Sequence, residues 1–337
     1  MRNDFGSFPQ RRMRRMRVNP FVRSLRRETF LSAADLIYPV FIVDSKNQSQ
    51  DIPSMPGVKR LCEKDLLAVA ERSLAAGLTS LALFPVIEAQ IKSLDGAAAF
   101  DSQGLTARTV RLLKKYFPQL GIICDVALDP YMSHGHDGLL GADGQVLNDE
   151  TVAILKRQAL CLAEAGCDIV APSDMMDGRI GAIRQGLDHS AFQQTAILAY
   201  SAKYNSGYYG PFRDAVGSKV NAREVDKATY QMDPHNSDEA MMEIALDLEE
   251  GADMVIIKPG LPYLDIIRRV KDRFQVPTFA YQVSGEYAML KAAGLQGWID
   301  EKRCALEALV CLKRAGCDAI MTYYGLEAGE WLQQQQD

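Results

Sequence analysis

Short apolar runs that follow helical patterns recur along the chain. A degenerate sequence repeat occurs four times, and each copy has a helical pattern, a glycine and a short apolar run. The glycines are Gly77, Gly166, Gly251 and Gly316. Glycine suits the left-handed position that ends a helix. The apolar run is too short for a helix and is typical of a strand that is buried on both faces. Each glycine therefore marks a joint between a helix and a strand.

Further strand-like runs complete a series of eight. The predicted strands span residues 36–43, 80–86, 121–128, 168–173, 196–202, 253–258, 278–284 and 318–324. Helical patterns lie between most of them, as at 150–165, where apolar residues share one face. Eight strands that alternate with helices predict an α/β protein with a parallel sheet. We favour a closed (β/α)8 (TIM) barrel over a doubly wound open sheet, because no glycine-rich nucleotide-binding fingerprint follows any strand.

Length and composition fit one such barrel with added segments. The 337 residues exceed the ~250 of a typical barrel, and we divide the chain into a basic N-terminal arm, residues 1–30, and a catalytic barrel domain, residues 31–337. No apolar run approaches the ~20 residues that span a bilayer. No apolar segment of a secretory signal follows the arginines of the arm. The seven cysteines form no CxxC pair, which favours a reducing compartment and predicts a cytoplasmic protein.

The arm is strongly basic, although the whole chain has a net charge of −5. Its nine arginines are Arg2, Arg11, Arg12, Arg14, Arg15, Arg17, Arg23, Arg26 and Arg27. One interpretation is an arm that binds nucleic acid. The other is a tail that docks on an acidic neighbouring subunit, and the acidic body of the protein favours it. We therefore expect neither nucleic acid nor a membrane as partner.

Polar residues stand where several predicted strands end. Ser173, Lys258 and Tyr323 each lie seven positions after a joint glycine, which puts them at about the same height in a barrel. Lys203 directly follows the strand at 196–202, and Ser284 ends the strand at 278–284. Active sites of such barrels lie at the carboxyl ends of the strands. These five residues are therefore predicted to converge on one rim.

The two strand-end lysines indicate carbonyl chemistry. A single buried lysine is equally explained by an ion pair or by a side chain that reaches solvent. Two ammonium groups close together each disfavour protonation of the other, and burial adds to this effect. One lysine would then be neutral near pH 7 and able to form a Schiff base with a ketone or aldehyde.

Two long polar segments follow strands, at 134–149 and 204–234, and are candidate lids over the site. Arg213 and Lys227 lie in the second segment and are candidates to bind a substrate carboxylate, or are solvated loop charges.

Asp125, Asp129 and Asp137 lie at and beyond the third strand. They suggest an oxygen-rich metal or proton-transfer site, with structural roles as the alternative.

Two further interpretations concern single positions. His134 and His136 bracket a glycine, so they belong either to that polar site or to a turn. Asp174 follows Ser173 and is expected either to orient active-site groups or to cap a helix.

Several motifs together resemble those of the porphobilinogen synthases, also called 5-aminolevulinate dehydratases. The most specific are Tyr-Ser-Ala-Lys-Tyr at 200–204, Ile-Lys-Pro-Gly at 257–260, Ala-Pro-Ser-Asp-Met-Met-Asp-Gly-Arg at 171–179 and Tyr-Gln-Val-Ser-Gly-Glu-Tyr at 281–287. The resemblance extends from about residue 20 to residue 332. It implies a lyase of tetrapyrrole (heme) biosynthesis that condenses two molecules of 5-aminolevulinate to porphobilinogen, with loss of two waters.

The resemblance also implies roles for individual residues. Lys258 matches the Schiff-base lysine of the first substrate, on the propionate side of the product, and Lys203 matches that of the second, on the acetate side. Ser284 and Tyr323 match the pair that holds one carboxylate. Arg213 and Lys227 match the pair that holds the other, with Gln231 nearby.

The main departure from the family pattern concerns the metal. Zinc-dependent members have three cysteines where this chain has Ala127, Asp129 and Asp137. Carboxylates suit magnesium better than zinc, so we predict no catalytic zinc. Magnesium-using relatives have a glutamate that matches Glu243, on the helical stretch 236–250, and that holds an activating, largely hydrated Mg²⁺.

The resemblance further implies that the arm wraps a neighbouring barrel and that the assembly is a homo-octamer. Two alternatives stay open from the residues alone. One is a Schiff-base (class I) aldolase, which needs a single imine-forming lysine. The other is a non-catalytic nucleic-acid-binding protein that uses the basic arm.

Overall fold

The computed structural model describes residues 6–45, 47–217 and 226–334. Three parts of the predictions lie outside these residues: Arg2 with the beginning of the arm, residues 218–225 of the second polar segment, and the last glutamines of the tail.

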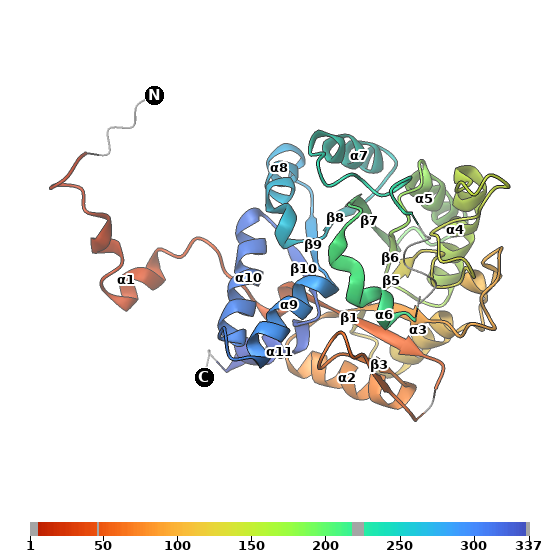
Figure 1. Cartoon of the computed structure of the whole chain (residues 1–337), viewed down its shortest axis with the longest axis horizontal. Helices are drawn as coiled ribbons and strands as arrows, with labels where there is room; N and C mark the ends of the chain where they lie inside the picture. Colours follow the sequence, from red (N-terminus) through yellow and green to blue (C-terminus); the bar gives the residue numbers. More distant parts are fainter. Residues whose placement is uncertain (1–5, 46, 218–225, 335–337) are drawn as a thin grey trace.

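Eight parallel strands close into a barrel, as predicted (Figure 1). In order around the ring they are β1 (Leu36–Val43), β4 (Ser80–Val86), β5 (Gly121–Val126), β6 (Ile169–Pro172), β7 (Ala196–Lys203), β8 (Met254–Lys258), β9 (Thr278–Gln282) and β10 (Ala319–Thr322). Strand β10 pairs with β1 through Leu36↔Ile320 and Ile37↔Met321, which closes the ring. The open doubly wound sheet is thereby excluded.

Helices surround the strands in Figure 1. They are α2 (Glu63–Ala75), α3 (Leu105–Tyr116), α4 (Asn148–Glu164), α5 (Arg179–His189), α7 (Asp238–Glu249), α8 (Leu264–Phe274), α9 (Ser284–Leu295), α10 (Glu301–Ala315) and α11 (Gly325–Gln333). The joint glycines have φ between +82° and +124° and follow α2, α4, α7 and α10. Their predicted left-handed conformation is confirmed, and it lets each helix turn back into the next strand without the strain a Cβ atom would cause.

Additional short elements lie over and beside the barrel. Strands β2 (Gln50–Asp51) and β3 (Lys59–Leu61) form an antiparallel pair that extends the sheet from β1. A short helix, α6 (Gly210–Ala215), follows β7 after the 3-10 turn η4 (Gly207–Tyr209). This turn and helix belong to the second polar segment and contact α9.

The arm extends away from the barrel (Figure 1). It contains η1 (Met13–Met16) and α1 (Pro20–Leu25), neither of which buries a residue, and η2 (Ala33–Asp35) leads from it into β1. Large apolar side chains such as Phe21 and Leu25 are exposed on it, at 63% and 82%. Within a single chain, the arm therefore lacks the apolar contacts that would hold it in place.

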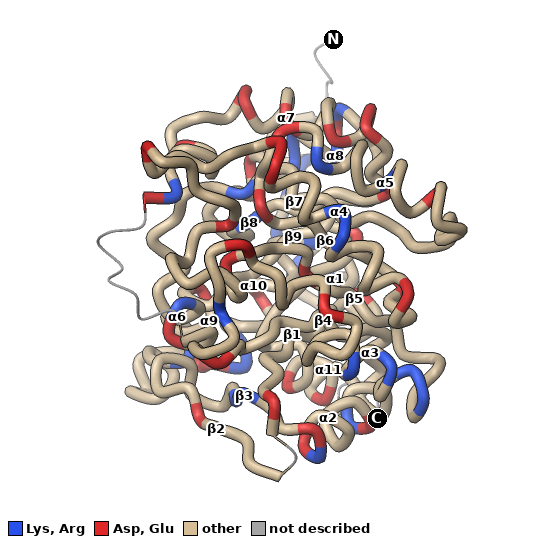
Figure 2. Tube along the Cα trace, turned by 90° about the vertical axis from the view of Figure 1, so that its right-hand side faces the viewer, with Lys and Arg blue, Asp and Glu red and all other residues tan. Residues whose placement is uncertain are grey.

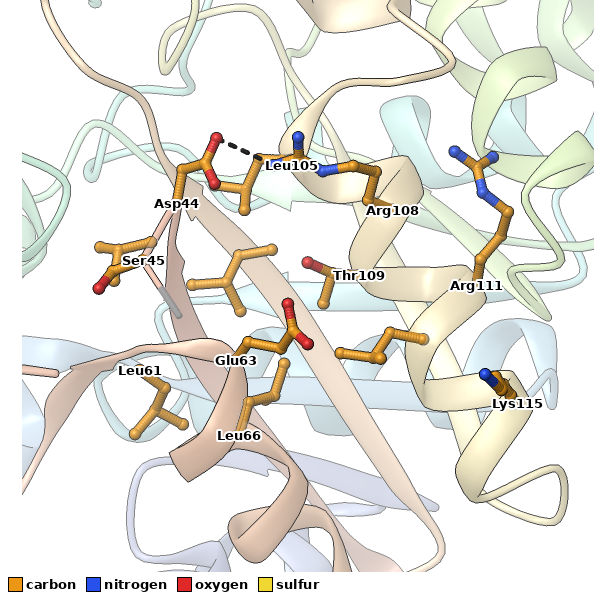
Figure 3. Close-up of a pocket in the computed structure, with 13 residues that line it drawn as sticks. Asp44, Ser45, Leu61, Glu63, Leu66, Leu105, Arg108, Thr109, Arg111 and Lys115 are labelled. Carbon is orange, nitrogen blue, oxygen red and sulfur yellow. Dashed lines mark ion pairs between the residues drawn. The ribbon is translucent and has the colours of Figure 1, made fainter. Parts of the chain in front are cut away.

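Charged residues of both signs are interspersed over the outer helices and loops (Figure 2). A cavity of about 440 Å³ lies among β1, α2 and α3, lined by an apolar floor and by charged residues that include Asp44 and Arg108 (Figure 3). It contains none of the strand-end lysines. No helix in the described part of the chain has the length and apolar character needed to cross a membrane.

Candidate active site

The two candidate lysines lie side by side. Lys203 is the last residue of β7 and Lys258 the last of β8, and the two are direct partners in the parallel pairing of these strands. The pairing shifts register between Ala199 and Ala202, which brings the strand ends level. Both lysines are buried, with exposures of 6% and 7%. The structure thus brings together the two ammonium groups that the sequence placed at strand ends.

Lys258 is surrounded by aromatic rings. Its Nζ lies 4.8 Å from the ring centre of Tyr281 and 5.2 Å from those of Tyr209 and Phe212. Burial and, after it, the charge of Lys203 together lower the pKa of Lys258 to about 7, against the opposing charges of nearby aspartates. About half of the Lys258 amino groups are therefore neutral near pH 7, and the neutral amine is the nucleophilic form.

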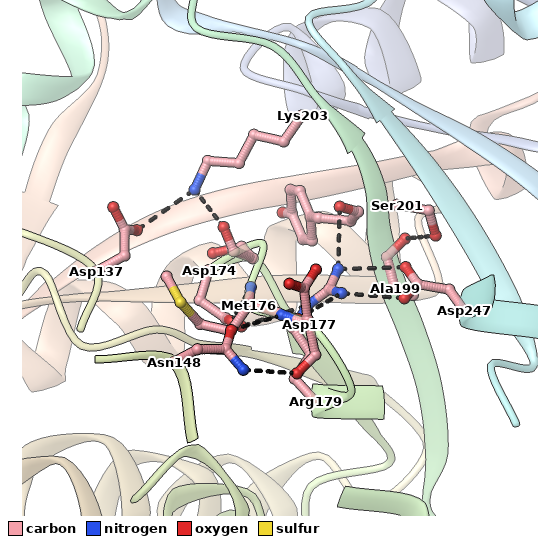
Figure 4. Close-up of polar contacts among 12 residues, drawn as sticks. Asp137, Asn148, Asp174, Met176, Asp177, Arg179, Ala199, Ser201, Lys203 and Asp247 are labelled. Carbon is pink, nitrogen blue, oxygen red and sulfur yellow. Dashed lines mark hydrogen bonds and ion pairs between the residues drawn. The ribbon is translucent and has the colours of Figure 1, made fainter. Parts of the chain in front are cut away.

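Lys203 has polar neighbours instead. Its Nζ donates to the backbone carbonyl of Ser173 and lies 3.4 Å from Oδ1 of Asp137 (Figure 4). Asp137 is completely buried. The two strand-end lysines thus differ in environment: one faces π-systems and the other a carboxylate.

Asp137 is the centre of a charged cluster. Its Oδ2 lies 2.6 Å from Nζ of Lys227 and accepts a 2.9 Å hydrogen bond from the hydroxyl of Tyr230. Burial alone would favour the neutral acid, but the positive charges of Lys203 and Lys227 hold the pKa of Asp137 well below its usual range. Lys227 also pairs with Asp129 at 3.2 Å. Asp129 and Asp137 are therefore already engaged with ammonium groups.

Asp125 at the end of β5 behaves differently. Burial raises its pKa to about 7, against the opposing charges of Lys258 and Lys203. Its Oδ1 has no hydrogen-bond partner among the described residues. A carboxyl group with this pKa next to two lysines can accept or release a proton near neutrality.

Ser284 and Tyr323 each contact an aromatic residue that surrounds Lys258. The hydroxyl of Ser284 accepts from the backbone N–H of Phe212 at 2.9 Å, and the hydroxyls of Tyr323 and Tyr281 are 2.8 Å apart. Phe212 connects the two, because its ring contacts Phe41, which stacks on Tyr323. Both hydroxyls are thus near the aromatic surroundings of Lys258.

Helix α6 carries Phe212 and the partly buried Arg213. Arg60 of β3 holds its last turn, donating to the carbonyl oxygens of Asp214 and Ala215 at 2.6 Å each. The hydroxyl of Ser54 also donates to the Asp214 carboxylate at 2.7 Å. The β2–β3 hairpin therefore anchors this part of the second polar segment.

Comparisons with known proteins agree with this site. The family model described as delta-aminolevulinic acid dehydratase matches residues 10–331. The chain belongs to this family. A dehydratase of this name from Bradyrhizobium diazoefficiens is 53% identical over 96% of this chain and 91% of that protein, and one from Rhodobacter capsulatus is 49% identical over 96% and 97%.

The solved structures include a porphobilinogen synthase from Toxoplasma gondii in complex with its reaction product, porphobilinogen. The two sequences are 48% identical, and the aligned part covers 96% of this chain and 92% of the Toxoplasma gondii chain. The structures superpose with a TM-score of 0.94. The predictions of family, barrel fold and lyase activity are confirmed. Family membership favours neither the aldolase nor the nucleic-acid-binding alternative.

A polar cavity lies beside Tyr230, which contacts Asp137 of the dehydratase site. This cavity, about 320 Å³, is lined by Gln231 and Tyr230 and by three carboxylates, those of Asp177, Glu239 and Glu243. Burial and the neighbouring carboxylates raise the pKa of Glu243. The structure thus puts Gln231 and Glu243, which the sequence placed in different segments, beside one space. Within the described ranges, no three His, Cys, Asp or Glu side chains converge closely enough to hold a metal directly.

Asp174 contacts a turn and an arginine and does not cap a helix. It is completely buried, its Oδ1 accepts from the N–H of Met176 at 2.8 Å, and its Oδ2 lies 3.6 Å from Nε of Arg179. The helix-cap alternative was wrong, because α5 begins after Gly178, which is its N-cap residue. Asp174 instead closes a turn and balances a buried arginine.

Three groups near the site were not predicted, and two of them, Arg179 and Glu286, are buried. Arg179 makes two hydrogen bonds, of 3.0 and 3.2 Å, to the carboxylate of Asp247 on α7 (Figure 4). Glu286 accepts from the N–H groups of Gly260 and Leu261, so it fixes the loop that follows Lys258. Tyr230 contacts Asp137. It lies three positions after Lys227, and this spacing is the only local signal that Tyr230 and Lys227 share a turn.

Proposed function

We propose that this enzyme condenses two molecules of 5-aminolevulinate to porphobilinogen, holding one as an imine on Lys258 and the other as an imine on Lys203. The observation that carries the proposal is the direct pairing of two buried lysines at the ends of β7 and β8, one of which has a pKa of about 7. An aldolase needs only one such lysine, so a buried pair with distinct surroundings favours the two-imine reaction.

Lys258 is suited to react first. Its neutral amine attacks the ketone carbon of one substrate, and the resulting carbinolamine loses water to give the imine. Protonated, this imine withdraws electrons from the neighbouring carbons. Ser284 and Tyr323 would hold the carboxylate of this substrate through their hydroxyls, once these exchange their present partners, Phe212 and Tyr281, for the ligand.

Lys203 would attack the second substrate as a neutral amine. Asp137, which pairs with it, and Asp125, which titrates near pH 7, are candidates to influence that step. Lys227 and Arg213 would bind the second carboxylate. Because Lys227 now pairs with two aspartates, the incoming carboxylate would replace at least one of them.

Magnesium is the metal that the side chains fit. The cavity beside Glu243 offers carboxylates and amides, including Asn148 and Gln145, around a volume that holds several waters. Mg²⁺ retains its waters readily and is often bound through one or two carboxylates, so Glu243 with Asp177 and Glu239 would hold a hydrated ion that supplies positive charge beside Tyr230 and Gln231. A catalytic zinc fits poorly, because Asp129 and Asp137 are engaged with lysines and Ala127 has no donor.

The exposed apolar side chains of the arm support its proposed docking on a neighbouring subunit in a homo-octamer. All seven cysteines are free, which supports the proposed cytoplasmic, reducing location. Related dehydratases from plants are chloroplastic by name, for example the one from Arabidopsis thaliana at 49% identity.

Reduction of imines with borohydride in the presence of 5-aminolevulinate tests the proposal, with the labelled lysines located by peptide mass spectrometry. We expect adducts on Lys258 and on Lys203, loss of the matching adduct in Lys258→Met and Lys203→Met, and porphobilinogen in the unreduced enzyme. The variant Lys115→Met, at an exposed position on α3, is the control. Labelling of one lysine only, under saturating substrate, would contradict the two-imine mechanism.

A further inference from the structure

The hydroxyl of Tyr230 lies among polar groups that belong to the second-substrate side of the site. It is 2.9 Å from Oδ2 of Asp137, 3.3 Å from the backbone N of Asp137 and 3.3 Å from Nδ1 of His136. Nothing in the motifs of the chain assigns a function to this tyrosine. Its contacts nevertheless fix the geometry of the one carboxylate that Lys203 and Lys227 share.

The direction of each hydrogen bond follows from the number of donors. A phenol has one proton and two acceptor lone pairs. Asp137 is ionised and can only accept at Oδ2, so the phenol proton goes there. The Tyr230 oxygen then accepts from the backbone N–H of Asp137, and its remaining lone pair faces His136, which must carry its proton on Nδ1. All three contacts are satisfied together by this single arrangement.

The surrounding chain holds Tyr230 at this point. The N–H of Met232 donates to the carbonyl of Lys203, and the N–H of Gln231 donates to the carbonyl of Lys227. These bonds form a tight turn from residue 227 to residue 231 and attach it to the end of β7. The ring of Tyr230 also packs at 60° against that of His136, with ring centres 6.2 Å apart. Lys227 and Tyr230 therefore approach Asp137 from the same turn.

We propose that Tyr230 is a positioning residue that orients the carboxylate of Asp137 so that Oδ1 faces Lys203 while Oδ2 faces Lys227. Without the phenol, the carboxylate is free to rotate and to present both oxygens to Lys227, whose Nζ is nearer at 2.6 Å than that of Lys203 at 3.4 Å. Lys203 would then lose its counter-ion. This inference rests on the proposed function, because it concerns the lysine that binds the second substrate.

The charged and titratable groups around Asp137 come from several elements. Lys203 comes from β7, Lys227 and Tyr230 from the turn before α7, and His136 from the loop after β5, while Asp129 shares Lys227. Loss of the phenol changes none of these charges. The effect of its removal should therefore be confined to the orientation of Asp137 and be felt at Lys203, not at Lys258.

The variant Tyr230→Phe tests this, since it keeps the ring and removes only the hydroxyl. With 5-aminolevulinate and borohydride, we expect the rate of adduct formation on Lys203 to fall about 10- to 100-fold, as for one lost hydrogen bond to a charged group. Adduct formation on Lys258 should stay within about 2-fold of its original rate. Tyr116→Phe, at a tyrosine that is 55% exposed, is the matched control.

A double-mutant cycle with Asp137→Asn separates positioning from general damage. If Tyr230 acts through Asp137, the double variant should label Lys203 no more slowly than Asp137→Asn alone. Incorporation of 4-aminophenylalanine at position 230 restores a hydrogen-bond donor on the ring and should recover most of the Lys203 labelling. This variant also allows the test if Tyr230→Phe is unstable.

Three results would overturn the inference while leaving the proposed function standing. The first is an equal loss of labelling at Lys203 and Lys258 in Tyr230→Phe, and the second is fully additive effects in the cycle. The third is unchanged labelling of Lys203 in Tyr230→Phe while the original enzyme labels both lysines, which would leave the proposed function intact. Absence of any Lys203 adduct in the original enzyme would overturn the proposed function and this inference with it.

Discussion

Lys258 should react as a free amine at a pH where ordinary lysines do not. Its pKa of about 7, against 10.5 for an ordinary lysine, makes about half of its molecules neutral at pH 7, compared with ~0.03% for an ordinary lysine. The difference is on the order of 1,600-fold in free amine. We expect this advantage to appear as a plateau in reactivity above about pH 8.

The assay follows imine formation with levulinate, a 4-oxo acid that lacks the amino group of the substrate and therefore cannot complete the condensation. Cyanoborohydride traps the imine, and mass spectrometry gives the labelling rate of Lys258 from pH 5.5 to pH 10. N-acetyl-lysine in the same solution is the reference for an ordinary lysine. The rate at Lys258 should rise to a midpoint near pH 7 and then level off, while the rate for N-acetyl-lysine continues to rise.

The variant Lys203→Met should move the Lys258 midpoint upward. The charge of Lys203 is, after burial, the main cause that lowers this pKa, whereas Asp125 and Asp137 act in the opposite direction and would be left uncompensated. Lys115→Met should leave the midpoint where it is. A Lys258 profile that runs parallel to that of N-acetyl-lysine up to pH 10, or a midpoint that falls in Lys203→Met, would refute the reasoning.

Three further outcomes are expected. Gly285→Ala should reduce turnover at least ~10-fold and lower the midpoint of thermal unfolding, because the added Cβ would lie 2.5 Å from the carbonyl oxygen of Tyr208; Gly207→Ala, where the added atom meets nothing, is the control. Arg179→Met should lower the free energy of unfolding in urea by about 3–5 kcal/mol, because it leaves buried carboxylates without a counter-ion. A decrease below about 1 kcal/mol would contradict the ion-pair interpretation. Chelation should lower activity until Mg²⁺ is restored, and Glu243→Gln should weaken that restoration; activation curves that coincide in the two proteins would exclude Glu243.

The ring of strands was predictable because its signals are local. The glycine joints and the apolar runs located every strand within about two residues, as for β7 at Ala196–Lys203 against the predicted 196–202. The two-residue error at the end of β5 has a physical reason. Ala127 and Leu128 continue the apolar run and are buried, but they lie in the loop after Val126 and outside the sheet. Apolar character reports burial and does not distinguish strand from buried loop.

The candidate lysines were predictable for the same reason, since both stand at a strand end. Residues whose partners are distant in the sequence could not be predicted. Arg179 meets Asp247 across 68 positions of the chain, and Arg60 reaches the last turn of α6 across about 155. Neither residue differs locally from a solvated surface arginine, so only the closed fold reveals these contacts.

The closure of the barrel has a consequence for how the enzyme is made in the cell. The first strand of the chain, β1, is held on one side by the last, β10, and Tyr323 follows directly after that last strand. During translation, the ring cannot close until almost the whole chain has emerged from the ribosome. The chain up to Lys258 contains six of the eight strands, so both lysines exist for a time in an incomplete barrel with exposed strand edges. Such a state is prone to bind chaperones and cannot yet enclose a reactive amine.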